Sequence, residues 1–139
     1  MKNTTELMEM MTRPPVRLTE DIRKIQGDIL IFGAGGKVGP SLAIMAARAC
    51  KEAGIEKRIM AASLFDRSGS AEMMAAYGVE IIECDFSDAA ALAALPDCPN
   101  IIFMAGKKFG TTENQSATWA VNVLLPAKVC ERYPKANFL

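Results

Sequence analysis

The fold is decided by one stretch of the sequence, Asp28-Ile-Leu-Ile-Phe32 followed by Gly33-Ala-Gly-Gly-Lys-Val-Gly39. Its first part is a short apolar run that ends in glycines, which is typical of a strand buried on both faces of a parallel sheet. Its second part is the turn out of that strand. A helical pattern begins at Pro40, where a proline is tolerated because its missing N–H would be unpaired in the first turn. The stretch predicts a strand, a glycine-rich turn and a helix in direct succession.

Strands and helices continue to alternate after this stretch. After the first helix, 40–53 with Gly54 at its end, we expect strands at 58–65, 79–83 and 100–104, helices at 70–77, 88–95 (capped by Ser87) and 114–132, and the beginning of a fifth strand at 136–139. Successive βα units predict a parallel, doubly wound sheet of the Rossmann type, with helices on both faces. Because the sequence stops inside an apparent strand, we expect the sheet to be truncated there and the chain to be the first part of a longer protein.

The residues before this unit are expected to form a helical arm, 1–26, next to a domain spanning 27–139. A short helix is predicted at 4–11, and Arg13-Pro14-Pro15 breaks it. Thr19 is a suitable N-cap for a second helix, 20–26, which Gly27 ends. Such an arm could dock on the domain or on a partner subunit.

Composition excludes several classes of protein. The chain has 139 residues with 16 basic and 16 acidic side chains, so it lacks the basic excess of a nucleic-acid-binding protein. The absence of histidine removes His-dependent triads and the commonest zinc ligand, and no metal site is expected. No membrane span or secretion signal is predicted, so the expected location is the cytoplasm. Four cysteines are expected to be buried, reduced thiols: Cys50, Cys84, Cys98 and Cys130.

The glycine loop has the composition of a phosphate-binding turn. Without side chains, the backbone can turn sharply and a pyrophosphate can approach it, while the following helix offers unpaired N–H groups and the positive end of its dipole. Gly39 would allow close packing of the helix on the strand. A Walker loop is excluded because Lys37 is followed by Val38 rather than Ser or Thr. Two alternatives remain, a loop for S-adenosylmethionine and a turn without a ligand.

The glycine spacing, 33, 36 and 39 with Gly35 in addition, resembles that of the extended short-chain dehydrogenase/reductase superfamily, the NAD-dependent epimerase/dehydratase family. The resemblance covers about residues 28–139. It implies a dinucleotide cofactor bound by a set of residues: Gly33, Gly35, Gly36, Lys37, Val38, Gly39, Asp85, Phe86, Met104, Ala105, Gly106 and Asn122. Asp85 and Phe86 would contact the adenine, and Met104 to Gly106 would lie beside the cofactor. The later matches also have structural interpretations: Asp85 as the start of a turn, Ala105-Gly106 as a strand exit and Asn122 as an ordinary polar residue on a helix. Lys107 and Lys108 could neutralise phosphate, and the alternative, which the sequence favours, is a solvated lysine pair.

The end of the second strand leaves the choice between NAD and NADP open. If the strand ends near Phe65, Asp66 would accept hydrogen bonds from the ribose 2′-hydroxyl of NAD. If it ends at Ala62, Ser63 takes that position and Arg67 could bind the 2′-phosphate of NADP. Asp66 lies further from the glycine loop than is usual, and the sequence favours NAD only slightly.

The resemblance also implies a Tyr-x-x-x-Lys pair, which this chain lacks: Tyr77 is followed four residues later by Ile81, and Tyr133 by Asn137. We therefore expect cofactor binding but no catalysis from this chain alone. The parent protein is expected to be an oxidoreductase or epimerase acting on a sugar-nucleotide or a similar alcohol or carbonyl substrate. The alternatives are a non-catalytic, NAD(P)-binding sensor or regulator and an interaction module with a relic loop. An exposed sheet edge would favour a homo-oligomer.

Overall fold

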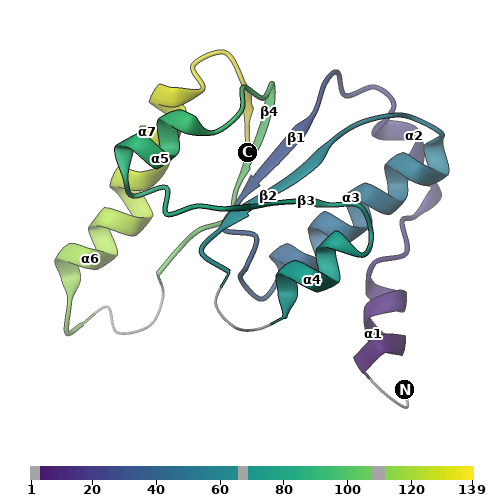
Figure 1. Ribbon diagram of the computed structural model, residues 1–139, viewed down its shortest axis with the longest axis horizontal. Coiled ribbons are helices and arrows are strands. Elements are labelled where there is room, and N and C mark those ends of the chain that lie inside the picture. The colour runs from purple at the N-terminus through teal and green to yellow at the C-terminus, as the bar shows by residue number, and fades with distance from the viewer. Residues whose placement is uncertain (1–3, 66–68, 108–111) are drawn as a thin grey trace.

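A computed structural model describes residues 4–65, 69–107 and 112–139 of the chain (Figure 1). Its centre is a five-stranded sheet in the order β3-β2-β1-β4-β5. All neighbouring strands are parallel. The strands are β1 (Ile29–Phe32), β2 (Ile59–Ser63), β3 (Glu80–Glu83), β4 (Asn100–Phe103) and β5 (Asn137–Phe138). The predicted parallel, doubly wound sheet is confirmed.

Helices cover both faces of the sheet (Figure 1). One layer contains α1 (Thr4–Met11), α2 (Val16–Asp21), α3 (Gly39–Ala53) and α4 (Ser70–Ala75). The other contains α5 (Ala89–Ala94) and one long helical segment made of α6 (Gln115–Trp119), the π-helical turn η1 (Ala120–Leu124) and α7 (Leu125–Arg132). In the first layer, α3 contacts α1, α2 and α4. None of the helices in the described ranges is both long and apolar enough to cross a membrane.

The central strand β1 is buried on both faces, as its apolar run predicts. Ile29 and Ile31 belong to the core that contains the α3 side chains, whereas Leu30 and Phe32 belong to the core that contains Val129 of α7. This division follows from the alternation of side chains along a strand. The strand β1 therefore contributes side chains to both cores, and the glycine turn begins where this strand ends.

The second core ends in a buried tyrosine after α7. The Tyr133 ring lies 6.1 Å from the Phe32 ring, centroid to centroid. Its hydroxyl donates a hydrogen bond of 2.9 Å to the carbonyl of Pro96. Burial raises the pKa of Tyr133 to about 12, so the phenol stays protonated at neutral pH and keeps this donor. The contact ties the end of α7 to the segment between α5 and β4.

The N-terminal arm is helical, but its second helix is not where the sequence predicted it. The first helix, Thr4–Met11, is as expected. The second is Val16–Asp21, with Pro15 rather than Thr19 at its N-cap. Leu18 and Ile22, four residues apart, both pack against the core beside α3, and Ile22 is only 2% exposed. Burial of this apolar pair outweighs the local capping preference of Thr19.

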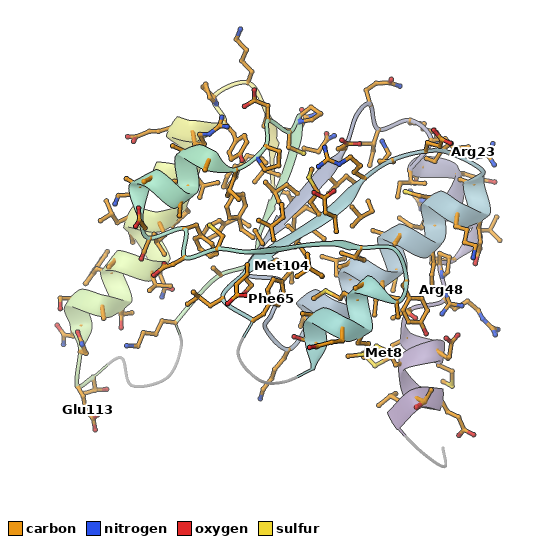
Figure 2. The ribbon with its side chains drawn as sticks, in the orientation of Figure 1. Met8, Arg23, Arg48, Phe65, Met104 and Glu113 are labelled. Atoms are coloured by element: carbon orange, nitrogen blue, oxygen red, sulfur yellow. The ribbon has the colours of Figure 1, made fainter. Side chains whose placement is uncertain are left out.

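The arm is attached to the domain by polar contacts at α1. The Arg48 guanidinium of α3 donates hydrogen bonds of 2.8 Å to the Glu9 carboxylate and 2.9 Å to the Thr12 hydroxyl. The Tyr77 hydroxyl donates to the same carboxylate, and these two donors lower the pKa of Glu9. Figure 2 shows Arg48 and Met8 on the side of the domain where α1 docks. In this structure the arm lies on its own domain.

The amino ends of β1, β4 and β5 are joined through one buried amide. The Asn100 side chain donates hydrogen bonds to the carbonyls of Gln26 (2.8 Å) and Asp28 (2.9 Å). Its oxygen accepts a hydrogen bond of 2.9 Å from the Asn137 amide. A buried amide with its polar atoms satisfied fixes the local geometry, since an unpaired one would be costly. This end of the sheet is therefore tied to the arm and to its edge strand.

The helix α5 begins one residue later than predicted, because Asp88 rather than Ser87 is its N-cap. The Asp88 carboxylate accepts hydrogen bonds from the N–H groups of Ala90 (2.7 Å) and Ala91 (3.3 Å). The Ser87 hydroxyl donates instead to the Asp85 carboxylate at 2.6 Å. Ser87, the cap expected from the sequence, is thus hydrogen-bonded within the turn that precedes α5.

We expect Asp88→Ala to lower the free energy of unfolding by about 1 kcal/mol, the usual cost of removing an N-cap. Urea denaturation followed by circular dichroism measures it. Ser87→Ala is the matched control and should cost less, because it removes no acceptor from the N–H groups of α5. Equal losses for the two variants would contradict the assignment of Asp88 as the cap.

Three of the four cysteines are buried, as expected: Cys50, Cys84 and Cys98. Burial raises the pKa of each of these thiols. Cys130 is exposed, so its expected burial is wrong. It follows Val129, which is fully buried in the core, and adjacent residues of a helix point in different directions.

Candidate functional site

The glycine loop begins at Gly33, a position whose backbone geometry and surroundings suit only glycine. Gly33 has a φ of +75°, and a Cβ atom there would lie 2.6 Å from the backbone nitrogen of Ala105. Its N–H donates a hydrogen bond of 2.8 Å to the Ala62 carbonyl of β2. The chain therefore leaves β1 through a narrow passage between β2 and the segment after β4, where a side chain would be strained and would clash.

Two further glycines allow close approach inside the loop. A Cβ on Gly39, the first residue of α3, would lie 2.2 Å from the Ala34 carbonyl oxygen. A Cβ on Gly35 would lie 2.8 Å from the Ser63 hydroxyl oxygen at the end of β2. Gly39 thus brings α3 directly against the turn, and Gly35 brings the loop against β2. Close helix–strand packing at Gly39 is the arrangement that the glycine spacing predicts.

Gly36 differs from these positions because its missing side chain faces open space. Among the described residues, the one atom within 4 Å of an added Cβ is the Gly33 carbonyl oxygen, at a van der Waals distance of 3.4 Å. Gly36 is exposed and borders a cavity. A side chain here would fit the backbone but would extend into the space in front of the loop. Gly36 therefore keeps this face of the loop accessible.

The cavity in front of the loop has a volume of about 620 Å³. It lies between the segments that follow β1 and β4, with α3 beginning at its border. This is where the sheet order reverses, the usual position of ligands in open α/β sheets. The lining residues are Gly33, Gly36, Lys37, Val38, Gly39, Met104, Gly106, Lys107 and Asn122.

The lining is suited to an anion. Among the described residues, the lining includes Lys37 and Lys107 and no acidic residue. The 15-residue helix α3 begins at Gly39, so its unpaired N–H groups and the positive end of its dipole lie at the same border. Backbone N–H groups, a helix N-terminus and cations are the groups that bind phosphates in proteins. The arrangement can bind a ligand with a phosphate or diphosphate group.

Asn122 holds the segment after β4 against the long helical segment. Its side-chain oxygen accepts a hydrogen bond of 2.7 Å from the Lys107 N–H, and its amide donates one of 2.9 Å to the Lys107 carbonyl. Asn122 lies in the π-helical turn η1, a feature that often occurs at functional sites. The structure thus brings Asn122 to the cavity together with Met104, Gly106 and the glycine loop.

Other predicted site residues lie outside the cavity lining. Phe86 is buried in the second core, where its ring packs edge-on against Phe32 with 5.3 Å between centroids. The Asp85 carboxylate accepts hydrogen bonds from the N–H and hydroxyl of Ser87, which lower its pKa. Ala105 packs behind Gly33, and Ser63 lies beside Gly35. Asp66 and Arg67 lie outside the described residues.

The strand β2 ends at Ser63, between the two positions considered from the sequence. Leu64 is exposed, and Phe65 has a φ of +43°, so the chain turns away from the sheet here. Phe65 and Met104 both pack against the first core, and Figure 2 labels them at the same edge of the sheet. The described residue at the strand end is therefore a serine, with a neutral hydroxyl.

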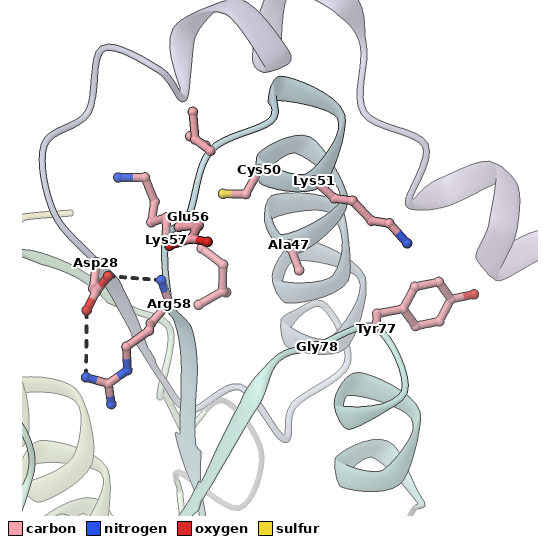
Figure 3. A pocket seen from close by; sticks show the side chains of 11 residues that line it. Asp28, Ala47, Cys50, Lys51, Glu56, Lys57, Arg58, Tyr77 and Gly78 are labelled. Carbon is pink, nitrogen blue, oxygen red and sulfur yellow. Dashed lines mark hydrogen bonds and ion pairs between the residues drawn. The ribbon is translucent and has the colours of Figure 1, made fainter.

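A second cavity, of about 440 Å³, lies at the opposite end of the sheet (Figure 3). Two of its described cations, Lys57 and Arg58, are engaged by the protein itself. Arg58 donates a backbone hydrogen bond of 2.9 Å to Asp28 and two side-chain hydrogen bonds to Glu80, and the Lys57 ammonium donates to backbone carbonyls. Across the described ranges, no group of three or more acidic or cysteine side chains could hold a metal ion. The cavity at the glycine loop is the better candidate for a ligand.

No family model and no curated protein matches the sequence. Solved structures do. An ADP-L-glycero-D-manno-heptose-6-epimerase from Helicobacter pylori matches 76% of this chain and 35% of its own length, with a TM-score of 0.60 and 20% identity. A short-chain dehydrogenase/reductase superfamily protein from Agrobacterium tumefaciens, solved with bound NAD, matches 80% of this chain and 31% of its own, with a TM-score of 0.51 and 21% identity.

A short-chain type dehydrogenase/reductase from Mycobacterium marinum matches 85% of this chain and 53% of its own length, with a TM-score of 0.58 and 15% identity. The chain therefore spans about a third to a half of the length of these proteins. At this level of identity the likeness concerns the fold. The chain has the Rossmann-type α/β fold that these short-chain dehydrogenase/reductase structures share.

Proposed function

We propose that this chain binds NAD(P) and forms the cofactor-binding part of an oxidoreductase or epimerase of the short-chain dehydrogenase/reductase superfamily. The observation that carries the proposal is the cavity at the switch point of the sheet, bordered by a bare glycine loop, the start of α3 and two lysines. The substrate of the whole protein would be an alcohol or carbonyl compound such as a sugar-nucleotide. The catalytic pair would lie outside these 139 residues.

The diphosphate of the cofactor would rest on the loop at Gly36, with Lys37 and the first N–H groups of α3 around it. The adenosine would extend toward Ser63 and Asp85 at the ends of β2 and β3, and the nicotinamide toward Met104, Gly106 and Asn122. When bound, the nicotinamide supplies hydride transfer to or from the substrate. The residues of this chain bind and orient the cofactor.

We propose NAD rather than NADP as the cofactor. The neutral hydroxyl of Ser63 at the end of β2 supplies no charge for a 2′-phosphate, and Asp66 follows three residues later. Arg67 is the residue that would reverse this preference. We also propose a cytoplasmic location, since three buried free thiols fit a reducing compartment.

A fluorescence titration with NADH and NADPH tests the proposal. We expect saturable binding to the wild-type chain, tighter for NADH. Gly36→Asp should weaken binding by at least about tenfold, because its side chain fills the space in front of the loop and its charge repels the diphosphate. Gly36→Asn is the matched variant of the same size without the charge, and it should weaken binding less.

We expect circular dichroism of each variant to show the wild-type fold, because an added Cβ at Gly36 meets a single atom of the described residues, at van der Waals distance. Folded wild-type protein that binds neither dinucleotide would overturn the proposal. Tighter binding of NADPH would keep the proposed function and reverse the choice of cofactor.

A further inference from the structure

The charge of the chain is distributed unevenly around the cavity. The whole sequence has a formal net charge of zero, yet the part of the cavity lining that the structure describes has two lysines and no acidic residue. Neither Lys37 nor Lys107 forms an ion pair with any residue that the structure describes. Two cations at the border of one cavity favour an anion between them. The described lining is therefore complementary to an anionic ligand.

The two lysines come from opposite borders of the cavity. Lys37 belongs to the glycine loop after β1, and Lys107 follows the end of β4. Lys107 is half-buried, and both polar groups of its backbone are hydrogen-bonded to the Asn122 side chain, at 2.7 Å and 2.9 Å. This double contact fixes where the Lys107 side chain starts.

We propose that Lys107 binds the diphosphate of the ligand from the β4 side, opposite the glycine loop, and that Asn122 is its positioning residue. This inference rests on the proposed dinucleotide binding and assigns a further binding residue to that site. The Lys107 ammonium supplies a mobile charge on a flexible stem, and the loop and α3 supply fixed N–H donors. The site thereby selects ligands that carry a diphosphate over those with a single phosphate.

The test compares Lys107→Met with Lys135→Met, which removes the same charge from an exposed position between α7 and β5. Lys107→Met should weaken NADH binding about tenfold, the loss expected for one charge-assisted contact, whereas Lys135→Met should leave it unchanged. The ionic-strength dependence of NADH binding should also be smaller in Lys107→Met, because salt screens the lost interaction. Unchanged affinity and unchanged salt dependence in this variant would overturn the inference.

Asn122→Ala separates positioning from a general effect on stability. If Asn122 acts through Lys107, removing the lysine in the Asn122→Ala background should cost much less than the tenfold seen in the wild type. Additive losses in this double-mutant cycle would contradict the positioning role.

Calorimetric titration with inorganic pyrophosphate distinguishes this inference from the proposed function. If the wild type binds pyrophosphate through Lys107 but neither NADH nor NADPH, the dinucleotide proposal fails and the diphosphate site remains. If it binds NADH and the Lys107→Met variant binds both probes equally well, the proposed function stands and the role of Lys107 is disproved.

Discussion

Gly39→Ala is expected to lower the free energy of unfolding by about 3 kcal/mol or more, although alanine is the better helix former. The added Cβ would lie 2.2 Å from the carbonyl oxygen of Ala34 and 2.6 Å from two further backbone atoms of that residue. Backbone atoms cannot rotate away as the end of a side chain can, so α3 would have to move off the loop. The loss should exceed the small gain in helix propensity.

Gly36→Ala is the matched control for this prediction, since it makes the same substitution three residues earlier in the same loop. Its Cβ meets one atom at 3.4 Å, and we expect a change of less than about 1 kcal/mol. Urea denaturation followed by circular dichroism suits both variants, because the single tryptophan, Trp119, is 67% exposed and reports poorly on the core. Similar stabilities for the two variants would show that α3 adjusts to the added carbon.

Phe32→Ala is expected to cost about 3–5 kcal/mol, the range for deleting a fully buried aromatic side chain. Phe32 is 0% exposed and lies at the centre of the second core. Its ring is within 5.3–6.2 Å of the rings of Phe86, Phe103 and Tyr133, centroid to centroid. Packing against Phe32 comes from three other segments, so its loss leaves a cavity that no single side chain can fill.

Phe138→Ala provides the comparison for this large effect. Phe138 is 39% exposed on the edge strand β5 and stacks on one ring, that of Phe103, at 6.2 Å. Its removal should cost much less than that of Phe32, because its surroundings are partly solvent. Thermal unfolding by calorimetry measures the loss of stability in both variants. Equal losses would contradict the expectation that Phe32 contributes more to stability than Phe138.

The central part of the fold could be predicted because local and long-range preferences agree there. The run before Gly33 is apolar enough for a strand buried on both sides, and the glycines that follow serve both the turn and the packing of α3. In the arm, by contrast, Thr19 has the local chemistry of a cap, but burial of Leu18 and Ile22 against α3 determines where the helix lies. A single sequence does not show which pair of apolar side chains in the arm will pack against the core of the domain.

Of the residues expected to bind a cofactor, those of the loop gather at the cavity more often than those that follow β2 and β3. Gly33, Gly36, Gly39, Met104, Gly106 and Asn122 line the cavity, whereas Gly35 lies against Ser63. The sequence leaves Lys107 between phosphate binding and a solvated pair, because its place in the cavity follows from the pairing of β1 with β4 and from the Asn122 contact. Phe86 is taken up by the aromatic packing around Phe32, which no local pattern indicates.

The buried Asn100 amide has a consequence for how this protein can diversify. It joins the amino ends of the strands to the arm, at the end of the sheet opposite to the glycine loop. Effects of substitutions at well-separated sites without shared partners are nearly additive. Exposed residues of the loop, such as Lys37 and Val38, can therefore change during evolution, and with them the preferred ligand, without weakening the contacts of Asn100 at the far end of the sheet.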